Sequence, residues 1–286
     1  NDGALFVVDV TSGQEKFAPL LIGRTRKVQF SPDGHWIAVG SRGTLGSVII
    51  NAETGSLAAQ FSADGRGGLP AFDPSSQRIA TANNDGLDGF ITIWDWDGSK
   101  LRELTSWPQV GNIASLSFSP DGSRLVSTEY NTSINKVWDA TTGEQLDMVK
   151  TRDDVHWSAF SRNGDEVALF SVSGGIRIWR YGAHEHGRSI NPLDGEATEV
   201  RFSPDGKSIL AATPMVFHGG RIRDDSQPHY QPQHARILDA EFGNLIATTS
   251  EAVYAATWSP DGREIVATSA AGDAIRTYDA RTGERL

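Results

Sequence analysis

One phrase recurs six times along this chain, and it constrains the fold more than any other feature. Each copy consists of a β-branched or aromatic run, a turn usually spelled Ser-Pro-Asp-Gly, and an apolar run, as in "SFSPDGSRLVST". Pro fixes φ and Asp-Gly supplies the turn residues, so each copy predicts a β-hairpin. The first turn residues are separated by 42, 46, 42, 42 and 56 residues: Ser31, Asp73, Ser119, Ser161, Ser203 and Ser259.

A second phrase follows each hairpin and predicts two further strands. In "KVWDATTGEQLDMVK" a Trp-Asp strand is followed by a Thr-Gly turn and a fourth strand. Strand alternation places Trp94, Trp138, Trp179 and Tyr278 on the same face of successive units. There is no helical periodicity between the strands, so we predict an all-β chain of four-stranded antiparallel sheets. Such sheets cannot bury both faces alone and must stack.

Together the two phrases resemble the WD-repeat family, through "IWD", "VWDATTGE" and "TYDARTGE", over nearly the whole chain. The resemblance implies a β-propeller whose blades are these sheets. In regular members a Gly-His pair, an Asp before the third strand, a Ser or Thr on the second strand and the Trp form a buried hydrogen-bond network. Here Gly111-Asn112 is the nearest relic of the Gly-His pair, and Asp88 is the clear Asp. We therefore expect mainly apolar packing, a divergence that is similar to that of bacterial members.

The strand count leaves both ends of the chain incomplete. Two strands, "ALFVVDV" and "EKFAPL", precede the first hairpin, five complete blades follow, and the last repeat has three strands. We predict one propeller domain over residues 1–286 with seven blades, of which 1–22 is a half-blade. The alternative is six blades, with Glu15 to Leu20 completing the last one and "LFVVDV" displaced. We also expect a fragment of a longer polypeptide, and self-association through the incomplete terminal blade.

The longest spacing contains an inserted loop, Thr213 to Arg236, between a second and a third strand. Loops of this length are uncommon unless they are functional or disordered. Arg and Tyr side chains are typical of interface hot spots, so we expect partner contact on this face. Two aromatic residues of other blades are expected on the same face. The candidate partner-binding residues are Trp107, Tyr130, Arg221, Arg223, His229, Tyr230 and Arg236.

The same loop also raises the question of a metal site. Zinc requires three or four converging ligands, and the spacing of His218, His229 and His234 does not impose convergence. His184 and His186 share a turn without an evident third ligand, and the aspartates of "NNDGLDG" and "DWDG" lack the ordered series of a calcium loop. The motifs of hydrolase elbows, phosphate loops and zinc proteases are missing. We predict no metal, no cofactor and no catalytic residues.

Charge and composition restrict the partners. The formal net charge of −10 opposes non-specific phosphate binding, so no nucleic-acid partner is expected. No apolar run is long enough for a membrane span, so no membrane contact is expected and the cytoplasm is the default location. With no cysteine, disulfides and thiolate metal sites are excluded.

These observations predict a non-enzymatic module for protein interaction, a sensor or scaffold. It would bind a protein, or another domain of its own polypeptide, on the face that carries the 213–236 loop. Resemblance to bacterial arrays implies the C-terminal region of a signalling NTPase or kinase. The alternative is a propeller that is an enzyme or binds a small ligand or metal at its central channel.

Overall fold

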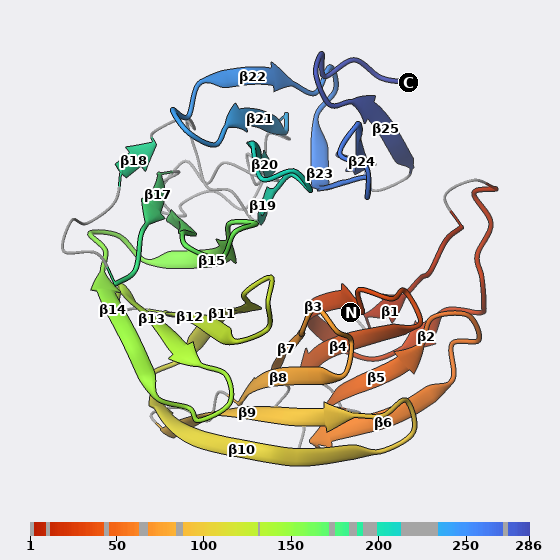
Figure 1. The fold of residues 1–286 in the computed structure, drawn as a ribbon. Coiled ribbons are helices and arrows are strands. Elements are labelled where there is room, and N and C mark those ends of the chain that lie inside the picture. The colour runs from red at the N-terminus through yellow and green to blue at the C-terminus, as the bar shows by residue number, and fades with distance from the viewer. Residues whose placement is uncertain are drawn as a thin grey trace, which may run out of the picture. The chain divides into compact units, whose positions relative to one another are not determined.

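The structure is a computed structural model that describes residues 3–9, 12–42, 46–62, 68–83, 88–130, 132–171, 175–182, 188–190, 199–212, 234–270 and 274–286. Every regular element in these ranges is a β-strand, which confirms the all-β prediction. The chain divides into two compact units, Asn1–Thr151 and Arg152–Leu286. Each unit contains three of the six sheets that are the blades of the β-propeller fold (Figure 1).

The blades follow each other along the sequence and are numbered here 1 to 6. Unit 1 contains blade 1 with β3 (Arg24–Phe30), β4 (Trp36–Arg42), β5 (Ser47–Asn51) and β6 (Leu57–Ser62), blade 2 with β7 (Leu69–Phe72), β8 (Arg78–Asn83), β9 (Asp88–Trp96) and β10 (Leu101–Val110), and blade 3 with β11 (Ile113–Phe118), β12 (Arg124–Glu129), β13 (Ile134–Asp139) and β14 (Gln145–Lys150).

Unit 2 has the same pattern, except that its last blade has three strands. It contains blade 4 with β15 (Val155–Phe160), β16 (Val167–Ser171), β17 (Ile176–Trp179) and β18 (Arg188–Ile190), blade 5 with β19 (Glu199–Phe202), β20 (Ser208–Ala212), β21 (Arg236–Asp239) and β22 (Leu245–Thr248), and blade 6 with β23 (Val253–Trp258), β24 (Glu264–Ser269) and β25 (Ile275–Asp279).

Within every blade the strands pair in sequence order and all pairs are antiparallel. The first-to-second and third-to-fourth turns therefore lie at one end of a blade, which we call its turn end. The second-to-third connection and the exit from the fourth strand lie at the other end, its loop end. The 213–236 segment joins β20 to β21, so it leaves blade 5 at the loop end, as the sequence predicts.

The N-terminal residues form a two-stranded sheet and not part of a seventh blade. This sheet pairs β1 (Ala4–Leu5) with β2 (Leu20–Leu21), and a bridge joins Val8 to Glu15. Six blades were the alternative count, and the described residues give that number. Of the residues expected to complete the last blade, Glu15 bridges Val8 and Leu20 pairs with Leu5 within the N-terminal hairpin.

The Ser-Pro-Asp-Gly turn is held by its own side chains. In blade 3 the Ser119 hydroxyl accepts from the Arg124 amide at 2.9 Å and donates to the Asp121 carboxylate at 2.5 Å. The Ser123 hydroxyl also donates to Asp121, at 2.7 Å. These hydrogen bonds, from Ser119 first and then from Ser123, lower the pKa of Asp121 from 3.8 to about 2. The turn therefore binds the charged carboxylate more strongly than the neutral acid.

Blade 2 forms the same turn from the sequence "DPSS". The carboxylate is now on the first turn residue and the hydroxyl donor on the third, the opposite of the arrangement in blade 3. Asp73 replaces the serine and accepts from the Arg78 amide at 3.0 Å, while the Ser75 hydroxyl donates to Asp73 at 2.8 Å. Ser76 stands where the other turns have Gly and adopts φ 63°. Its hydroxyl accepts from the Asp33 amide of blade 1 at 3.1 Å. This inter-blade hydrogen bond offsets the cost of a left-handed backbone at a residue with a Cβ.

Acid should weaken the blade 3 turn in a defined pH range. The folded-state pKa of Asp121 is depressed, so its contribution to stability is present above the unfolded value of 3.8 and is lost as the pH falls through about 2. Asp121→Asn should lower the urea midpoint at pH 7, and the gap to the unsubstituted chain should shrink as the pH falls below 4. Blade 4 has Asn163 at this position, where it accepts from Ser161 at 2.7 Å, so the fold tolerates the amide. A gap that stays constant with pH would contradict this assignment.

Candidate partner-binding surface

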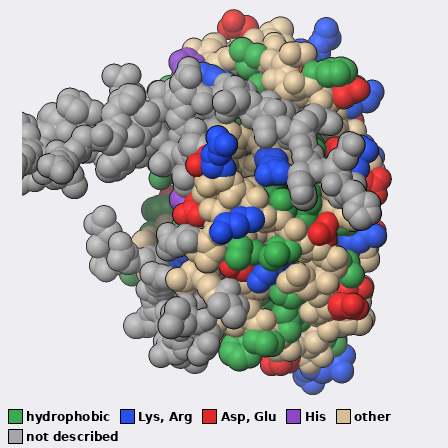
Figure 2. Space-filling model, turned by 90° about the vertical axis from the view of Figure 1, so that its left-hand side faces the viewer, with side chains coloured by type: hydrophobic (Ala, Val, Ile, Leu, Met, Phe, Trp, Pro, Cys, Tyr) green, Lys and Arg blue, Asp and Glu red, His purple; other side chains and the backbone are tan. Residues whose placement is uncertain are grey.

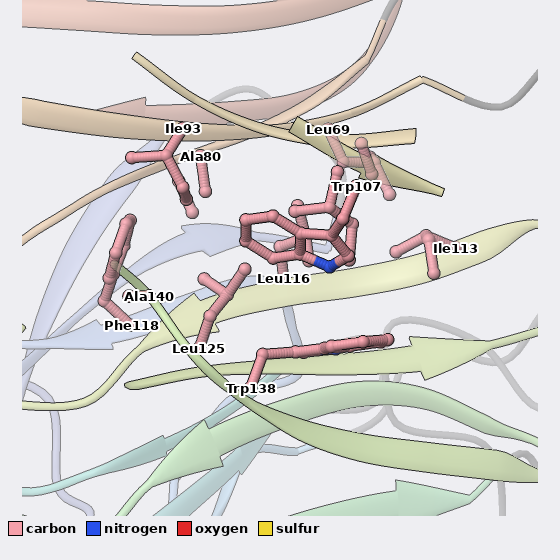
Figure 3. Close-up of a cluster of buried hydrophobic side chains, with 13 residues drawn as sticks. Leu69, Ala80, Ile93, Trp107, Ile113, Leu116, Phe118, Leu125, Trp138 and Ala140 are labelled. Atoms are coloured by element: carbon pink, nitrogen blue, oxygen red, sulfur yellow. The ribbon is translucent and has the colours of Figure 1, made fainter. Parts of the chain in front are cut away.

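Trp107, expected as an exposed aromatic in a loop, is instead a core residue. Strand β10 continues through it, and Trp107 pairs with Ile91 of β9. The side chain is 7% exposed, and its ring centroid lies 5.8 Å from that of Trp138 in blade 3. Figure 3 shows the indole of Trp107 directed into the cluster between Leu69 and Trp138. The expectation of exposure is corrected, because the fourth strand is longer than its sequence suggests.

Two other predicted residues lie at loop ends and are half-buried. Tyr130 follows β12, and its amide donates to the Asn112 carbonyl at 2.7 Å. Arg236 opens β21 and pairs with Thr248 of β22. The remaining candidates lie outside the described residues: Arg221, Arg223, His229 and Tyr230.

A buried polar cluster that was not predicted from the sequence lies at the loop end of blades 2 and 3. Glu129 at the end of β12 is 2% exposed, and its carboxylate lies 2.8 Å from the Lys136 Nζ of β13. The Thr132 hydroxyl donates to the other oxygen of Glu129 at 2.9 Å. Gln109 of β10, also 2% exposed, donates its amide N–H to Glu129 and accepts from Lys136 at 3.3 Å. Charged residues inside otherwise apolar strand phrases were the available signal.

The chemistry of this cluster is that of a structural link between two blades. Both carboxylate oxygens of Glu129 have partners within blades 2 and 3, with Lys136 and Gln109 at one oxygen and Thr132 at the other. The ammonium group of Lys136 also lies 5.5 Å from the centroid of the Trp138 ring, a cation–π geometry. The cluster therefore fixes Gln109, and with it the end of β10, against blade 3 beside Tyr130.

The loop end of unit 2 is anchored differently. Thr249, after β22, is 1% exposed; its hydroxyl accepts from the Ala235 amide at 2.9 Å and donates to the Glu251 carbonyl at 2.8 Å. The Thr249 carbonyl lies 2.5 Å from His234 Nδ1, and its amide donates to the Ala235 carbonyl at 2.9 Å. These contacts hold the residues at which the 213–236 segment re-enters blade 5.

Metal ligands do not gather in the described part of the chain, where no group of three His, Asp or Glu residues could hold an ion. Of the histidines considered for a metal, His234 is described and bonds to Thr249. His184, His186, His218 and His229 lie outside the described residues. Nor does any helix with the length and apolar character to cross a bilayer occur among the described residues.

The Trp-Asp strands retain one hydrogen bond of the network that the resemblance implied. The indole N–H of Trp94 donates to the Thr81 hydroxyl at 2.8 Å, and that of Trp138 donates to the Ser127 hydroxyl at 2.8 Å. In each case the acceptor is on the second strand of the same blade. Blades 2 and 3 thus add this hydrogen bond to their apolar packing.

Comparison with known proteins agrees with this geometry. The family model described as "WD domain, G-beta repeat" matches residues 98–139, which run from the turn before the fourth strand of blade 2 to the end of the third strand of blade 3. The chain is 28% identical over 196 residues to eukaryotic translation initiation factor 3 subunit I of Lodderomyces elongisporus, covering 65% of this chain and 53% of that protein. These matches support the resemblance of the chain to the WD-repeat family.

Other WD-repeat relatives come from different organisms. An uncharacterized WD repeat-containing protein of Synechocystis is 32% identical over 136 residues, which cover 46% of this chain and 36% of that protein. The periodic tryptophan protein 2 homolog of Schizosaccharomyces pombe is 26% identical over 166 residues, or 50% and 19% of the two chains. The matched region spans about half of the initiation-factor relative and a smaller share of these two.

The burial of Trp107 generates a test with an internal control. Gly143 has φ +74°, and a Cβ there would lie 2.6 Å from the Trp107 ring, whereas Gly13 has φ +70° with nothing within 4 Å. Both Gly→Ala substitutions cost about 1–2 kcal/mol of unfolding free energy for the left-handed backbone. Gly143→Ala should cost about 1–3 kcal/mol more, because the methyl group overpacks the core. Equal losses in urea unfolding would show that Trp107 is not held against this turn.

The buried ion pair generates a second test. Lys136→Met should destabilise the fold by about 3–5 kcal/mol, because it leaves the buried Glu129 carboxylate without its cation. Arg102→Met removes the cation of an exposed pair with Asp95, whose side chains are 72% and 41% exposed, and should cost less than about 1 kcal/mol. Denaturant unfolding of the two variants checks this ranking. Similar losses would mean that the Glu129 pair is not shielded from water.

Proposed function

We propose that this chain is a non-enzymatic protein-interaction scaffold that binds a protein partner at the loop end of its blades. The observation that carries the proposal is the anchoring of Ala235 and His234 to Thr249. A long inserted connection re-enters a rigid sheet at these residues, which is how binding loops are commonly presented. The contact residues would be Tyr130, Arg221, Arg223, His229, Tyr230 and Arg236, while Trp107 supports the surface from the core.

The similarity to WD-repeat proteins supports the same proposal. One relative carries the name of a subunit of a translation initiation factor, and a subunit contacts other proteins. None of the relatives reported above has a name that denotes an enzyme. On this basis we transfer a scaffold role, and not the identity of any partner, to the present chain.

Charge favours a protein partner over a nucleic acid. The net charge is −10. On the described part of the face in Figure 2, Lys and Arg side chains lie among acidic and hydrophobic ones. A phosphate backbone requires a continuous basic stripe, whereas protein interfaces combine apolar anchors with scattered charges of both signs.

Several finer expectations stay predictions. They are a place in a bacterial signalling NTPase or kinase, a cytoplasmic location, and self-association through the incomplete terminal blade. The first follows from the family resemblance, the second is a general default, and the third follows from unpaired edge strands.

Deleting residues 215–233 tests the surface. The purified chain and the deletion variant would be crosslinked in extract of the source organism, and any specific partner would be purified for titration by calorimetry. We expect the deletion to abolish binding while the melting temperature stays nearly unchanged, because the described pairing of β20 with β21 uses residues 208–211 and 236–239, which the deletion leaves in place.

Single substitutions test whether the Arg236 side chain itself contributes to partner binding. Arg236→Gln, which keeps most of the side-chain length, should weaken binding, whereas Arg263→Gln at the exposed turn end of blade 6 should not. Partner binding that survives the deletion, or that responds equally to both substitutions, would rule out the loop end as the binding surface.

A further inference from the structure

A hollow of about 460 Å³ lies at the turn end of unit 1, where blades 1 and 2 meet. Blade 1 contributes Asp33 and Trp36 from its first turn. Blade 2 contributes Gln77 from its first turn and Asp95, Trp96 and Asp97 from the end of its third strand. The aspartates of "DWDG" therefore face a concavity, in addition to forming a turn.

Unit 2 contains a hollow at the equivalent place, between blades 4 and 5, and it has about 830 Å³. The two hollows are formed by equivalent residues of the repeat. In unit 1 the Trp96 amide donates to the Gln77 carbonyl, and in unit 2 the Ala240 amide donates to the Lys207 carbonyl. Ala240 in place of Trp96 explains the larger volume. The repeat thus builds a hollow at this boundary, and the local sequence decides its chemistry.

The two linings differ in charge. The unit 2 hollow contains three basic residues, Arg162, Arg180 and Lys207, together with acidic ones. The unit 1 hollow contains Asp33, Asp95 and Asp97 and has no lysine or arginine among its described lining residues. It is therefore acidic, while its counterpart is mixed.

Local hydrogen bonds favour the charged form of two carboxylates in the unit 1 hollow, Asp33 and Asp97. Burial raises the pKa of Asp33, but hydrogen bonds from the Ser31 hydroxyl and the His35 amide outweigh it and hold that pKa below its usual value. The amides of Lys100 and Ser99 and the Ser99 hydroxyl lower the pKa of Asp97. The partner of Asp95 is Arg102, 3.1 Å away in an exposed pair that exchanges readily with solvent.

Aromatic side chains form the rest of the wall. Trp36 is half-buried and meets Trp96 edge to face, with ring centroids 5.0 Å apart and planes at 88°. Trp96 is 2% exposed, and its indole N–H has no acceptor among the described residues. Trp96 lines the hollow beside Trp36, so the two indoles give it an aromatic wall.

We propose that this hollow binds an arginine side chain presented by a segment of a partner protein. A guanidinium group has five N–H donors in a plane, and it can stack on Trp36 while donating to several carboxylates. An ammonium group makes a single point contact and would use fewer of these groups. The site lies at the turn end, so it is distinct from the loop-end surface proposed above, and either can fail without the other.

The probe is the blocked tripeptide acetyl-Gly-Arg-Gly-amide, titrated into the nitrogen-15-labelled chain. The indole N–H resonances of Trp36 and Trp96, assigned from Trp→Phe variants, should move in a saturable manner. The citrulline tripeptide, which has the same shape without the charge, should leave them in place. The lysine tripeptide should bind more weakly than the arginine one.

A charge substitution guided by the repeat tests the location. Gln77→Lys installs the residue that the unit 2 hollow has at this position, so the fold should accept it, and it should weaken arginine binding about tenfold or more. Gln145→Lys adds the same charge at an exposed position outside the hollow and should change binding little. Equal titration by citrulline, equal affinity for lysine, or unchanged binding in Gln77→Lys would each overturn the proposal.

Discussion

Each blade of this chain has apolar side chains on both faces of its sheet, so no blade is stable without neighbours. Ile37, Ala38 and Val39 of β4 are consecutive and all 0% exposed, although successive residues of a strand point to opposite faces. Ile37 and Val39 pack with Val7 and Ile22 of the N-terminal segment, while Ala38 packs with blade 2. The stacking of sheets is thus required by the strand sequences themselves.

Polar contacts then join neighbouring blades at defined points. The Arg78 guanidinium pairs with Asp73, donates to the Gly122 carbonyl of blade 3 at 2.6 Å, and lies 5.6 Å from the centroid of the Phe118 ring. At the opposite end of the same two blades, Gln109 joins the pair of Glu129 and Lys136. Apolar packing alone tolerates sliding, whereas such directional contacts select one register between adjacent sheets.

The repeat also explains how one scaffold acquires different local chemistry. The same backbone hydrogen bonds recur in the turns of successive blades. Residues at equivalent positions of two blade boundaries therefore occupy equivalent places, although their side chains differ. Trp36 and Trp96 at one boundary correspond to Glu166 and Ala240 at another, which converts an aromatic acidic hollow into a larger mixed one. Recognition can therefore differ from boundary to boundary without any change of fold.

The sequence by itself determined the strands and the turns, because these depend on local alternation, on Pro and Gly backbone preferences and on a regular period. The propeller fold followed from the family resemblance, and the count of six blades was decided by the structure. The sequence also located the inserted connection of blade 5. The tertiary structure decided what depends on residues distant in the chain. Trp107 is buried because β10 extends along β9, and the Gln109, Glu129 and Lys136 cluster assembles from three strands of two blades. Side-chain environment is set by register and by the neighbouring sheet, and neither is encoded in a single repeat.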